Sequence, residues 1–131
     1  FSNNRKVQVV NAGLCDEDTQ KQIYINNDSS STNILTENTQ ESFFFDYSRL
    51  LRESGQIVDV FKINIEGDEY SLLKSIISNG CHTNIKNILV QFHDFIPGHE
   101  QMKKEIEDEL IKTHDRVFCY EYIWEHWKLR T

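Results

Sequence analysis

Short apolar runs separated by polar stretches divide the first part of the chain. Residues 7–14 are apolar and β-branched and run into an acidic turn, so they predict a buried strand. Residues 21–25 alternate polar and apolar side chains, which predicts a second strand in a hairpin with the first. Asn, Ser, Thr, Glu and Gln dominate residues 26–42, which predicts a long surface loop. The three phenylalanines at 43–45 predict a return to the core.

A strand, a helix and another strand are predicted between residues 57 and 92. Residues 57–65 form a nearly continuous apolar run, typical of a strand covered on both faces of its sheet. Residues 68–77 have acids in the first turn and apolar side chains at helical spacing, so they predict a core-packing helix. Residues 85–92 predict the next strand, and a strand-helix-strand unit of this kind is parallel and right-handed.

Two further helices and one strand complete the predicted elements. Asp46 or Ser48 can cap a short helix that Gly55 ends. Residues 102–110 have an apolar side chain at every fourth position, which predicts an amphipathic surface helix with lysine–acid pairs on its solvent face. Residues 117–124 are aromatic and predict a strand near the end of the chain.

The composition and charge of the chain predict one acidic domain over residues 1–131 and exclude some classes of binding partner. The chain has 14 Lys and Arg against 21 Asp and Glu, a net charge of -7. An acidic surface repels phosphates, so we expect no nucleic-acid partner. No apolar run approaches the ~20 residues of a membrane span, so we expect none. Cys15, Cys81 and Cys119 are odd in number and lack C-x-x-C spacing, which favours small buried side chains in a cytoplasmic protein.

Polar side chains follow both strands of the strand-helix-strand unit. Asn64 and Glu66 end the first strand, and Gln91, His93 and Asp94 end the second. The carboxyl ends of neighbouring parallel strands meet at one edge of a sheet, where ligands bind in α/β folds, so we expect one site here. Glu66 and His93 can move protons near neutral pH, whereas Asn64 and Gln91 can only position a ligand.

Structural roles compete with functional ones at these positions. Glu66 can be only a cap or dipole partner for the following helix, and Glu69 in its first turn fits a solvated or capping acid. His93 can be an ordinary histidine satisfied at a strand end. A metal hydrolase is a third interpretation, but Lys103 stands where an H-E-x-x-H motif beginning at His99 would need its second histidine.

The strand ends carry a likeness to a known family. Residues 62–70, K-I-N-I-E-G-D-E-Y, followed by Q-F-H-D-F at 91–95, resemble the FkbM-type methyltransferases, whose mark is a K-I-D-x-E-G-x-E strand end. Residues 10–14, 113–114 and 122–127 resemble further parts of that family. The resemblance implies a Rossmann-like class I methyltransferase fold, with a mostly parallel sheet flanked by helices. It also implies that S-adenosylmethionine is bound and its methyl group transferred, commonly to a sugar or natural-product hydroxyl.

The resemblance also implies roles for individual residues. His93 or Glu66 would deprotonate the acceptor, and Asn64 would position acceptor or cofactor. The full implied set is catalytic Asn64, Glu66 and His93, acceptor-binding Glu69, Gln91 and Asp94, and Asn11 and Ala12 near the adenine of the cofactor. Two positions depart from the family's pattern, because its usual Asp is Asn64 here and an acid often found later is Gln91.

The cofactor-binding start of the family's domain has no counterpart in this chain. The glycine-rich first strand-loop-helix is absent, as is the acid that ends the family's second strand. We therefore expect the chain to be the C-terminal portion of such an enzyme, lacking the N-terminal strand-helix units and completed by a homodimer or a larger polypeptide. The alternative is a non-catalytic methyltransferase-like module that binds a partner through its exposed edge or aromatic end.

Overall fold

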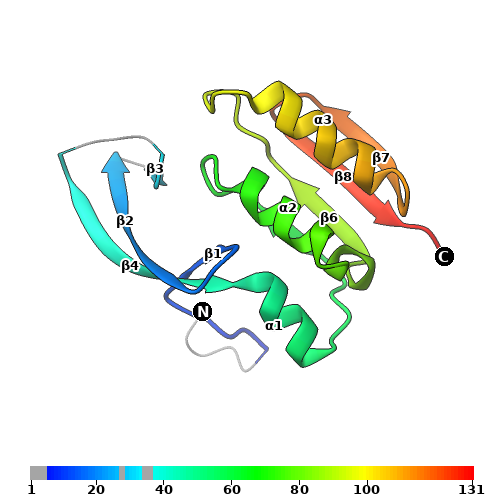
Figure 1. Ribbon diagram of the computed structural model, residues 1–131, viewed down its shortest axis with the longest axis horizontal. Coiled ribbons are helices and arrows are strands. Elements are labelled where there is room, and N and C mark those ends of the chain that lie inside the picture. Colours follow the sequence, from blue (N-terminus) through cyan, green and yellow to red (C-terminus); the bar gives the residue numbers. More distant parts are fainter. Residues whose placement is uncertain (1–5, 27–28, 34–36) are drawn as a thin grey trace.

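The computed structural model describes residues 6–26, 29–33 and 37–131, which form two four-stranded sheets and three α-helices (Figure 1). The strands are β1 (Gly13–Cys15), β2 (Thr19–Asn26), β3 (Ser29–Ser31), β4 (Thr39–Asp46), β5 (Phe61–Ile63), β6 (Asn87–Val90), β7 (His114–Tyr120) and β8 (Trp124–Leu129). The helices are α1 (Tyr47–Ser54), α2 (Glu69–Ser78) and α3 (His99–Leu110), with a 3-10 turn at Cys81–Asn84.

The N-terminal sheet has the strand order β1-β4-β2-β3. The strand predicted at 21–25 is confirmed within β2, but its predicted hairpin with the first strand is wrong, because β1 pairs with β4 in parallel. The predicted buried strand is also wrong over most of its length, since Val9 and Val10 are 71% and 58% exposed. β1 itself begins only at Gly13.

The predicted loop at 26–42 is wrong where β3 and the start of β4 form strands, while residues 27–28 and 34–36 lie outside the described residues. A strand with one face in solvent accepts the Ser, Thr and Gln side chains that suggested a loop. The phenylalanines show the same alternation, since Phe44 is buried and Phe43 and Phe45 are exposed. Only one of the three is buried, so the predicted return of all three to the core is wrong.

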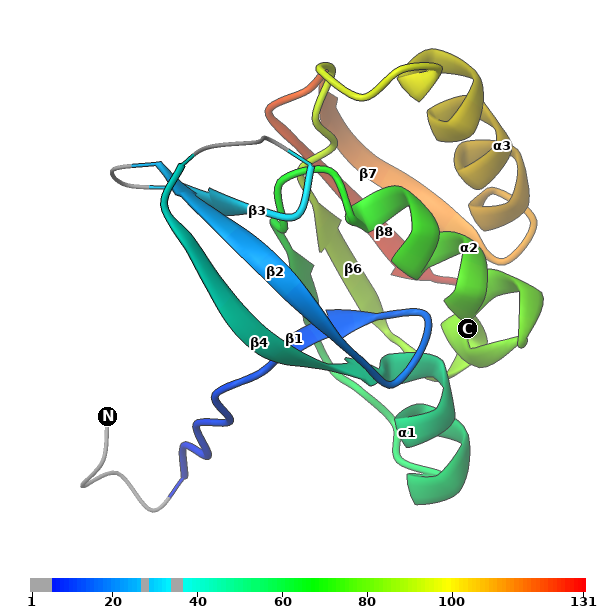
Figure 2. The same ribbon diagram turned by 60° about the vertical axis from the view of Figure 1, so that its left-hand side comes forward.

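The C-terminal sheet has the strand order β5-β6-β8-β7. The predicted strand-helix-strand unit is confirmed, because β5 and β6 are parallel and α2 connects them. β5 is shorter than the predicted 57–65, and Ile57 and Val60 are exposed before it. α2 and α3 lie side by side on one face of this sheet, as Figures 1 and 2 both show. Ile88, Val90 and Trp127 are buried within the resulting two layers.

The predicted mostly parallel Rossmann-like sheet is wrong. The structure has two mixed sheets, because β2 runs antiparallel to β4 and β8 runs antiparallel to both β6 and β7. The single strand predicted at 117–124 is instead a hairpin of β7 and β8, and the three residues between them can join only antiparallel neighbours. Tyr122 in that turn has a φ of 53°, which reverses the chain direction within a few residues.

The predicted helices are confirmed, with one change on the polar face of α3. Asp46 caps α1 by accepting the backbone N–H of Arg49, and Gly55 ends the helix in the left-handed conformation. Lys103 was expected on the solvent face but is buried, because its ammonium reaches past Glu107 to the buried carboxylate of Glu125, 2.7 Å away. The aliphatic part of Lys103 thereby joins the core side of α3.

The apolar core lies between α2, α3 and the C-terminal sheet. Its buried members include Ile63, Leu72, Leu73, Ile106 and Trp127. Cys15 and Cys81 are buried as predicted, whereas Cys119 is exposed. No helix in the described ranges has the length and apolar character needed to cross a membrane.

Candidate functional site

The carboxyl ends of β5 and β6 meet at one edge of the C-terminal sheet, as the sequence predicted. Ile63 stands opposite Val90 in the parallel register, and the backbone N–H of Gln91 donates to the Ile63 carbonyl at 3.0 Å. The polar residues that follow both strands therefore leave the sheet side by side. Glu66 and His93 come together here.

Glu69 is the buried centre of this cluster. Its carboxylate is fully buried and accepts the backbone N–H of Gly67 at 2.9 Å and that of His93 at 2.8 Å. The imidazole Nδ1 of His93 lies 3.0 Å from the same carboxylate. An ionised carboxylate only accepts hydrogen bonds, so the imidazole makes this contact through an N–H at Nδ1, and its Nε2 faces Glu66. Glu69 thus orients the imidazole of His93, and the expectation of a solvated acid at this position is wrong, whereas its acceptance of the Gly67 N–H just before α2 agrees with the capping alternative.

Tyr70 fixes the backbone of His93 from the other side. Its hydroxyl donates to the His93 carbonyl at 2.8 Å. Burial, followed by the nearby charge of Glu69, raises the pKa of Tyr70, so this hydroxyl keeps its proton through the neutral range. Both backbone groups of His93 are therefore held by residues at the start of α2, and the ring has one orientation relative to Glu69.

Glu66 lies beside His93, and its side chain is the more exposed of the two. Its backbone has a φ of 52°, a left-handed conformation that side chains other than glycine rarely adopt. Its carboxylate lies 3.7 Å from His93 Nε2, with side chains 27% and 12% exposed respectively. This distance is too long for a direct hydrogen bond, so a proton passes between them only when the groups close up or a water bridges them.

A pocket of about 300 Å³ lies between the two sheets, and Glu66 is on its wall. We call it the inter-sheet pocket. Its described lining residues are Gly13, Leu14, Ile23, Ser31, Thr32, Phe44, Asn64, Ile65, Glu66 and Asp68. Apolar side chains thus form one part of the wall, and hydroxyl, amide and carboxylate groups form the rest. Two of these residues are acidic and none is basic, so the pocket suits a neutral or cationic ligand.

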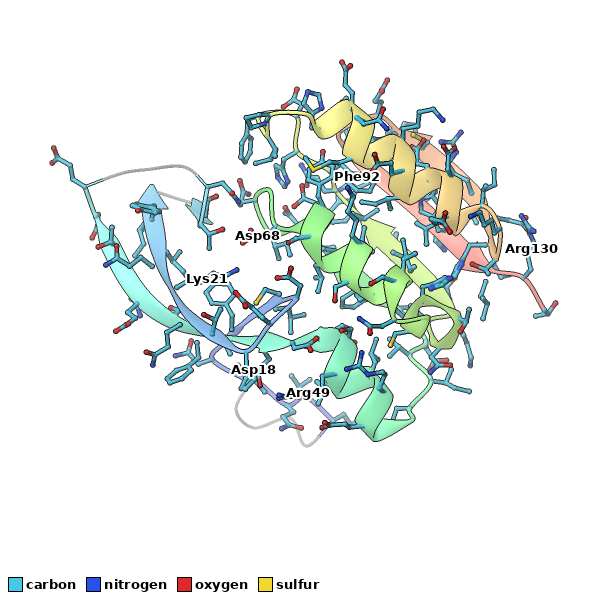
Figure 3. All side chains as sticks on the ribbon, in the orientation of Figure 1. Asp18, Lys21, Arg49, Asp68, Phe92 and Arg130 are labelled. Carbon is cyan, nitrogen blue, oxygen red and sulfur yellow. The ribbon has the colours of Figure 1, made fainter. Side chains whose placement is uncertain are left out.

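Residues 31–33, at the end of β3, join the pocket to the N-terminal sheet. The Ser31 hydroxyl donates to the Glu66 carbonyl at 2.9 Å, and the Asn33 amide donates to the same carbonyl at 3.3 Å. Thr32 donates to the carboxylate of Asp68, which Figure 3 labels at the loop before α2. Sequence reasoning missed these residues, because a polar Ser-Thr-Asn tract before a second polar stretch has no pattern that indicates a site.

The other predicted site residues lie at different distances from this pocket. Asn64 is on its wall, but Gln91 and Asp94 are not among its lining residues. Asn11 is exposed outside it. Ala12 lines a separate, largely apolar cavity of about 740 Å³ between β1, β4 and α1. The roles inferred for Asn11 and Ala12 at an adenine remain predictions.

The polar groups of the pocket wall can be compared with the charged groups of a methyl donor. The carboxylates of Glu66 and Asp68 suit the positive charge of a sulfonium or an ammonium group. Ala12 lines the other cavity, so the adenine contact predicted for it is not part of this pocket. Within the described ranges, no three His, Cys, Asp or Glu side chains are grouped so that they could hold a metal ion.

No family model, curated protein or solved structure matches this chain. Its likeness to the FkbM-type methyltransferases therefore depends on the motif residues alone.

Proposed function

We propose that this chain forms the acceptor-deprotonating part of an S-adenosylmethionine-dependent O-methyltransferase of FkbM type. The acceptor is a hydroxyl of a sugar or natural product. The observation that carries the proposal is the series Glu66, His93 and Glu69, in which the carboxylate of a pocket-lining residue lies beside an imidazole that a buried carboxylate orients. Methyl transfer as the reaction is supported by the likeness of residues 62–70 to the family's motif.

The series fits the demands of methyl transfer to oxygen. S-adenosylmethionine supplies an electrophilic methyl group, whose bond to sulfur breaks as its bond to the acceptor oxygen forms, so that S-adenosylhomocysteine leaves. Alignment of donor and acceptor provides most of the acceleration. A base is needed because the acceptor is a hydroxyl, whose proton must leave as the oxygen–carbon bond forms. Glu66 takes that proton at the pocket wall. His93 Nε2 can receive it in turn, and the fixed charge of Glu69 stabilises the resulting imidazolium.

Asn64 supplies the orienting contact. It lies on the same pocket wall as Glu66, two residues earlier. A side-chain amide can both donate to and accept from a hydroxyl but cannot take its proton. We therefore assign Asn64 to positioning the acceptor, and assign proton transfer to Glu66 and His93.

Isotope transfer tests the proposal. The protein is titrated with S-adenosylmethionine by calorimetry, then incubated with methyl-labelled donor and a panel of neutral sugars, and the products are analysed by mass spectrometry. We expect saturable donor binding and labelled product. His93→Gln should lower the transfer rate at least about 100-fold, because a positioned acid–base group contributes that much or more.

His126→Gln is the matched control. His126 is also partly buried, but its imidazole contacts Asn87 on the C-terminal sheet and does not line the inter-sheet pocket. We expect this variant to transfer at the wild-type rate. Equal rates in His93→Gln and wild type would overturn the assignment of proton transfer to His93. No heat at millimolar donor would overturn the enzyme proposal for this chain and favour the binding module.

The binding module is the second candidate, and the apolar cavity beside α1 favours it. Val10, Leu14, Phe45, Tyr47 and Leu50 contribute to this cavity. Large exposed apolar surfaces on a protein mark places where another polypeptide or ligand binds. In this case, donor titration gives no heat, and Leu50→Asp weakens partner binding while leaving Glu66 and His93 in place.

A further inference from the structure

The loop that carries Glu66 is held by a different sheet from the one that positions His93. Ser31 and Asn33 both donate to the Glu66 carbonyl, and Asn33 also donates to the Asp68 carboxylate at 3.3 Å. The Ser31 hydroxyl is itself the acceptor for the backbone N–H of Asn33 at 2.9 Å. Residues 31–33 therefore form a connected hydrogen-bonded clamp from β3 onto the loop.

The clamp acts at a residue whose backbone is left-handed. Glu66 has a φ of 52°, and the following Gly67 has a φ of 108°. Left-handed backbone at a non-glycine residue persists only where surrounding contacts hold it. The Glu66 carbonyl accepts from both Ser31 and Asn33, so these contacts fix the peptide that follows the strained residue.

The direction of the Glu66 side chain depends on that backbone. With the carbonyl fixed, the carboxylate lies 3.7 Å from His93 Nε2, and Glu66 is one of the residues that line the inter-sheet pocket. If Glu66 relaxed to a right-handed or extended conformation, its Cβ would point elsewhere and the carboxylate would leave the imidazole. The hydrogen bonds of Ser31 and Asn33 thus affect the position of the Glu66 carboxylate through the one peptide group to which they donate.

We propose that Ser31 and Asn33 are positioning residues, which hold Glu66 in its left-handed conformation from the N-terminal sheet. This proposal rests on the proposed function, because it assigns a purpose to the placement of Glu66. It also makes the N-terminal sheet part of the catalytic arrangement, although that sheet contributes neither the base nor the imidazole.

The imidazole of His93 is the reporter for the first test. Its ring C–H resonance is recorded by NMR in wild type, Ser31→Ala, Asn33→Ala and Glu66→Gln proteins under one set of conditions. We expect both clamp variants to move the resonance toward its position in Glu66→Gln, because the carboxylate leaves the ring. Asn33 is exposed, so its variant tests the proposal even if Ser31→Ala folds poorly.

Ser71→Ala is the matched control for the loss of one serine hydroxyl. Ser71 donates to the Asp68 carbonyl at 3.1 Å, but this bond is local to the start of α2 and does not cross between the sheets. We expect no movement of the His93 resonance in this variant. A resonance that stays at its wild-type position in both clamp variants would overturn the proposal.

A double-mutant cycle provides the second test. In urea unfolding, Ser31→Ala should change the unfolding equilibrium constant about fivefold or more in the wild-type background. In a Glu66→Gly background there is no backbone strain whose release could offset the lost hydrogen bond, so the effect of Ser31→Ala should be larger. Equal effects in both backgrounds would mean that the clamp does not hold the strained conformation.

The outcomes separate this proposal from the proposed function. If the His93 resonance moves as expected but no labelled methyl group is transferred, the positioning role stands and the methyltransferase assignment fails. If transfer depends on His93 while the resonance ignores Ser31 and Asn33, the base assignment stands and the positioning role fails.

Discussion

Replacing Glu69 with glutamine removes the charge at the centre of the site with the least change in shape. The carboxylate oxygens of Glu69 accept two backbone N–H groups and face the Nδ1 of His93. Glutamine offers one oxygen and one NH₂ group, so the backbone N–H of Gly67 or of His93 then faces a donor. Because Glu69 is fully buried, water cannot replace the lost acceptor.

The size of the effect follows from these contacts. A buried polar group left without a partner costs about 1–3 kcal/mol, and a hydrogen bond to a charged acceptor contributes about 1.5–3 kcal/mol. We therefore expect Glu69→Gln to lower the free energy of unfolding by about 3 kcal/mol. Such a loss is a large part of the stability of an ordinary small domain.

Urea unfolding followed by tryptophan fluorescence measures this change. Trp127 is almost fully buried, so its emission reports the loss of the core. Glu53→Gln is the control, because Glu53 is an exposed carboxylate in the last turn of α1 and should be replaceable without measurable loss. If Glu69→Gln unfolded within about 0.5 kcal/mol of wild type, the carboxylate would not be the centre of the network.

Three further predictions concern the backbone and the pH dependence of stability. Gly67→Ala should cost about 3 kcal/mol in urea unfolding, because its φ is 108° and the added Cβ would lie 2.5 Å from Ile96 Cδ1. Gly55→Ala, with a φ of 59° and no atom within 4 Å of the added Cβ, should cost only about 1–2 kcal/mol. Asp46→Ala should destabilise α1 by about 1 kcal/mol, and Asp46→Asn should retain the cap in the same measurement. Burial lowers the pKa of His114, so the unfolded chain binds more protons and stability should fall as the pH drops below about 6.5. His114→Gln should weaken that dependence, and an unchanged slope would contradict the assignment.

Patterns that are local in sequence predicted the helices and the meeting of two strand ends. The repeat of apolar residues along α2 and α3 is set by the geometry of each helix alone, and the structure confirms both helices. The parallel pairing of β5 and β6 follows from the helix that joins them. These elements were enough to place Glu66 and His93 at one edge.

Pairing between distant segments could not be predicted in the same way. β3 consists of three serines, which have no apolar alternation, and only its pairing with β2 makes it a strand. Glu69 looks like an ordinary first-turn acid, and its burial follows from N–H groups that the fold brings to it from Gly67 and His93. Both features depend on tertiary structure and on no single stretch of sequence.

The two sheets contribute unequally to the apolar core, so they should differ in the free energy at which they open locally. The core is built from α1, the C-terminal sheet, α2 and α3, and of the described residues in the N-terminal sheet only Leu14 packs against it. Regions with few buried apolar contacts open locally at a lower free energy than the whole protein unfolds. Backbone amides of β2 and β4 should therefore exchange with solvent well before those of β6. A ligand bound between the sheets would slow the exchange of the β2 and β4 amides most. Part of its binding free energy would then offset the cost of holding the less stable N-terminal sheet against the more stable C-terminal one.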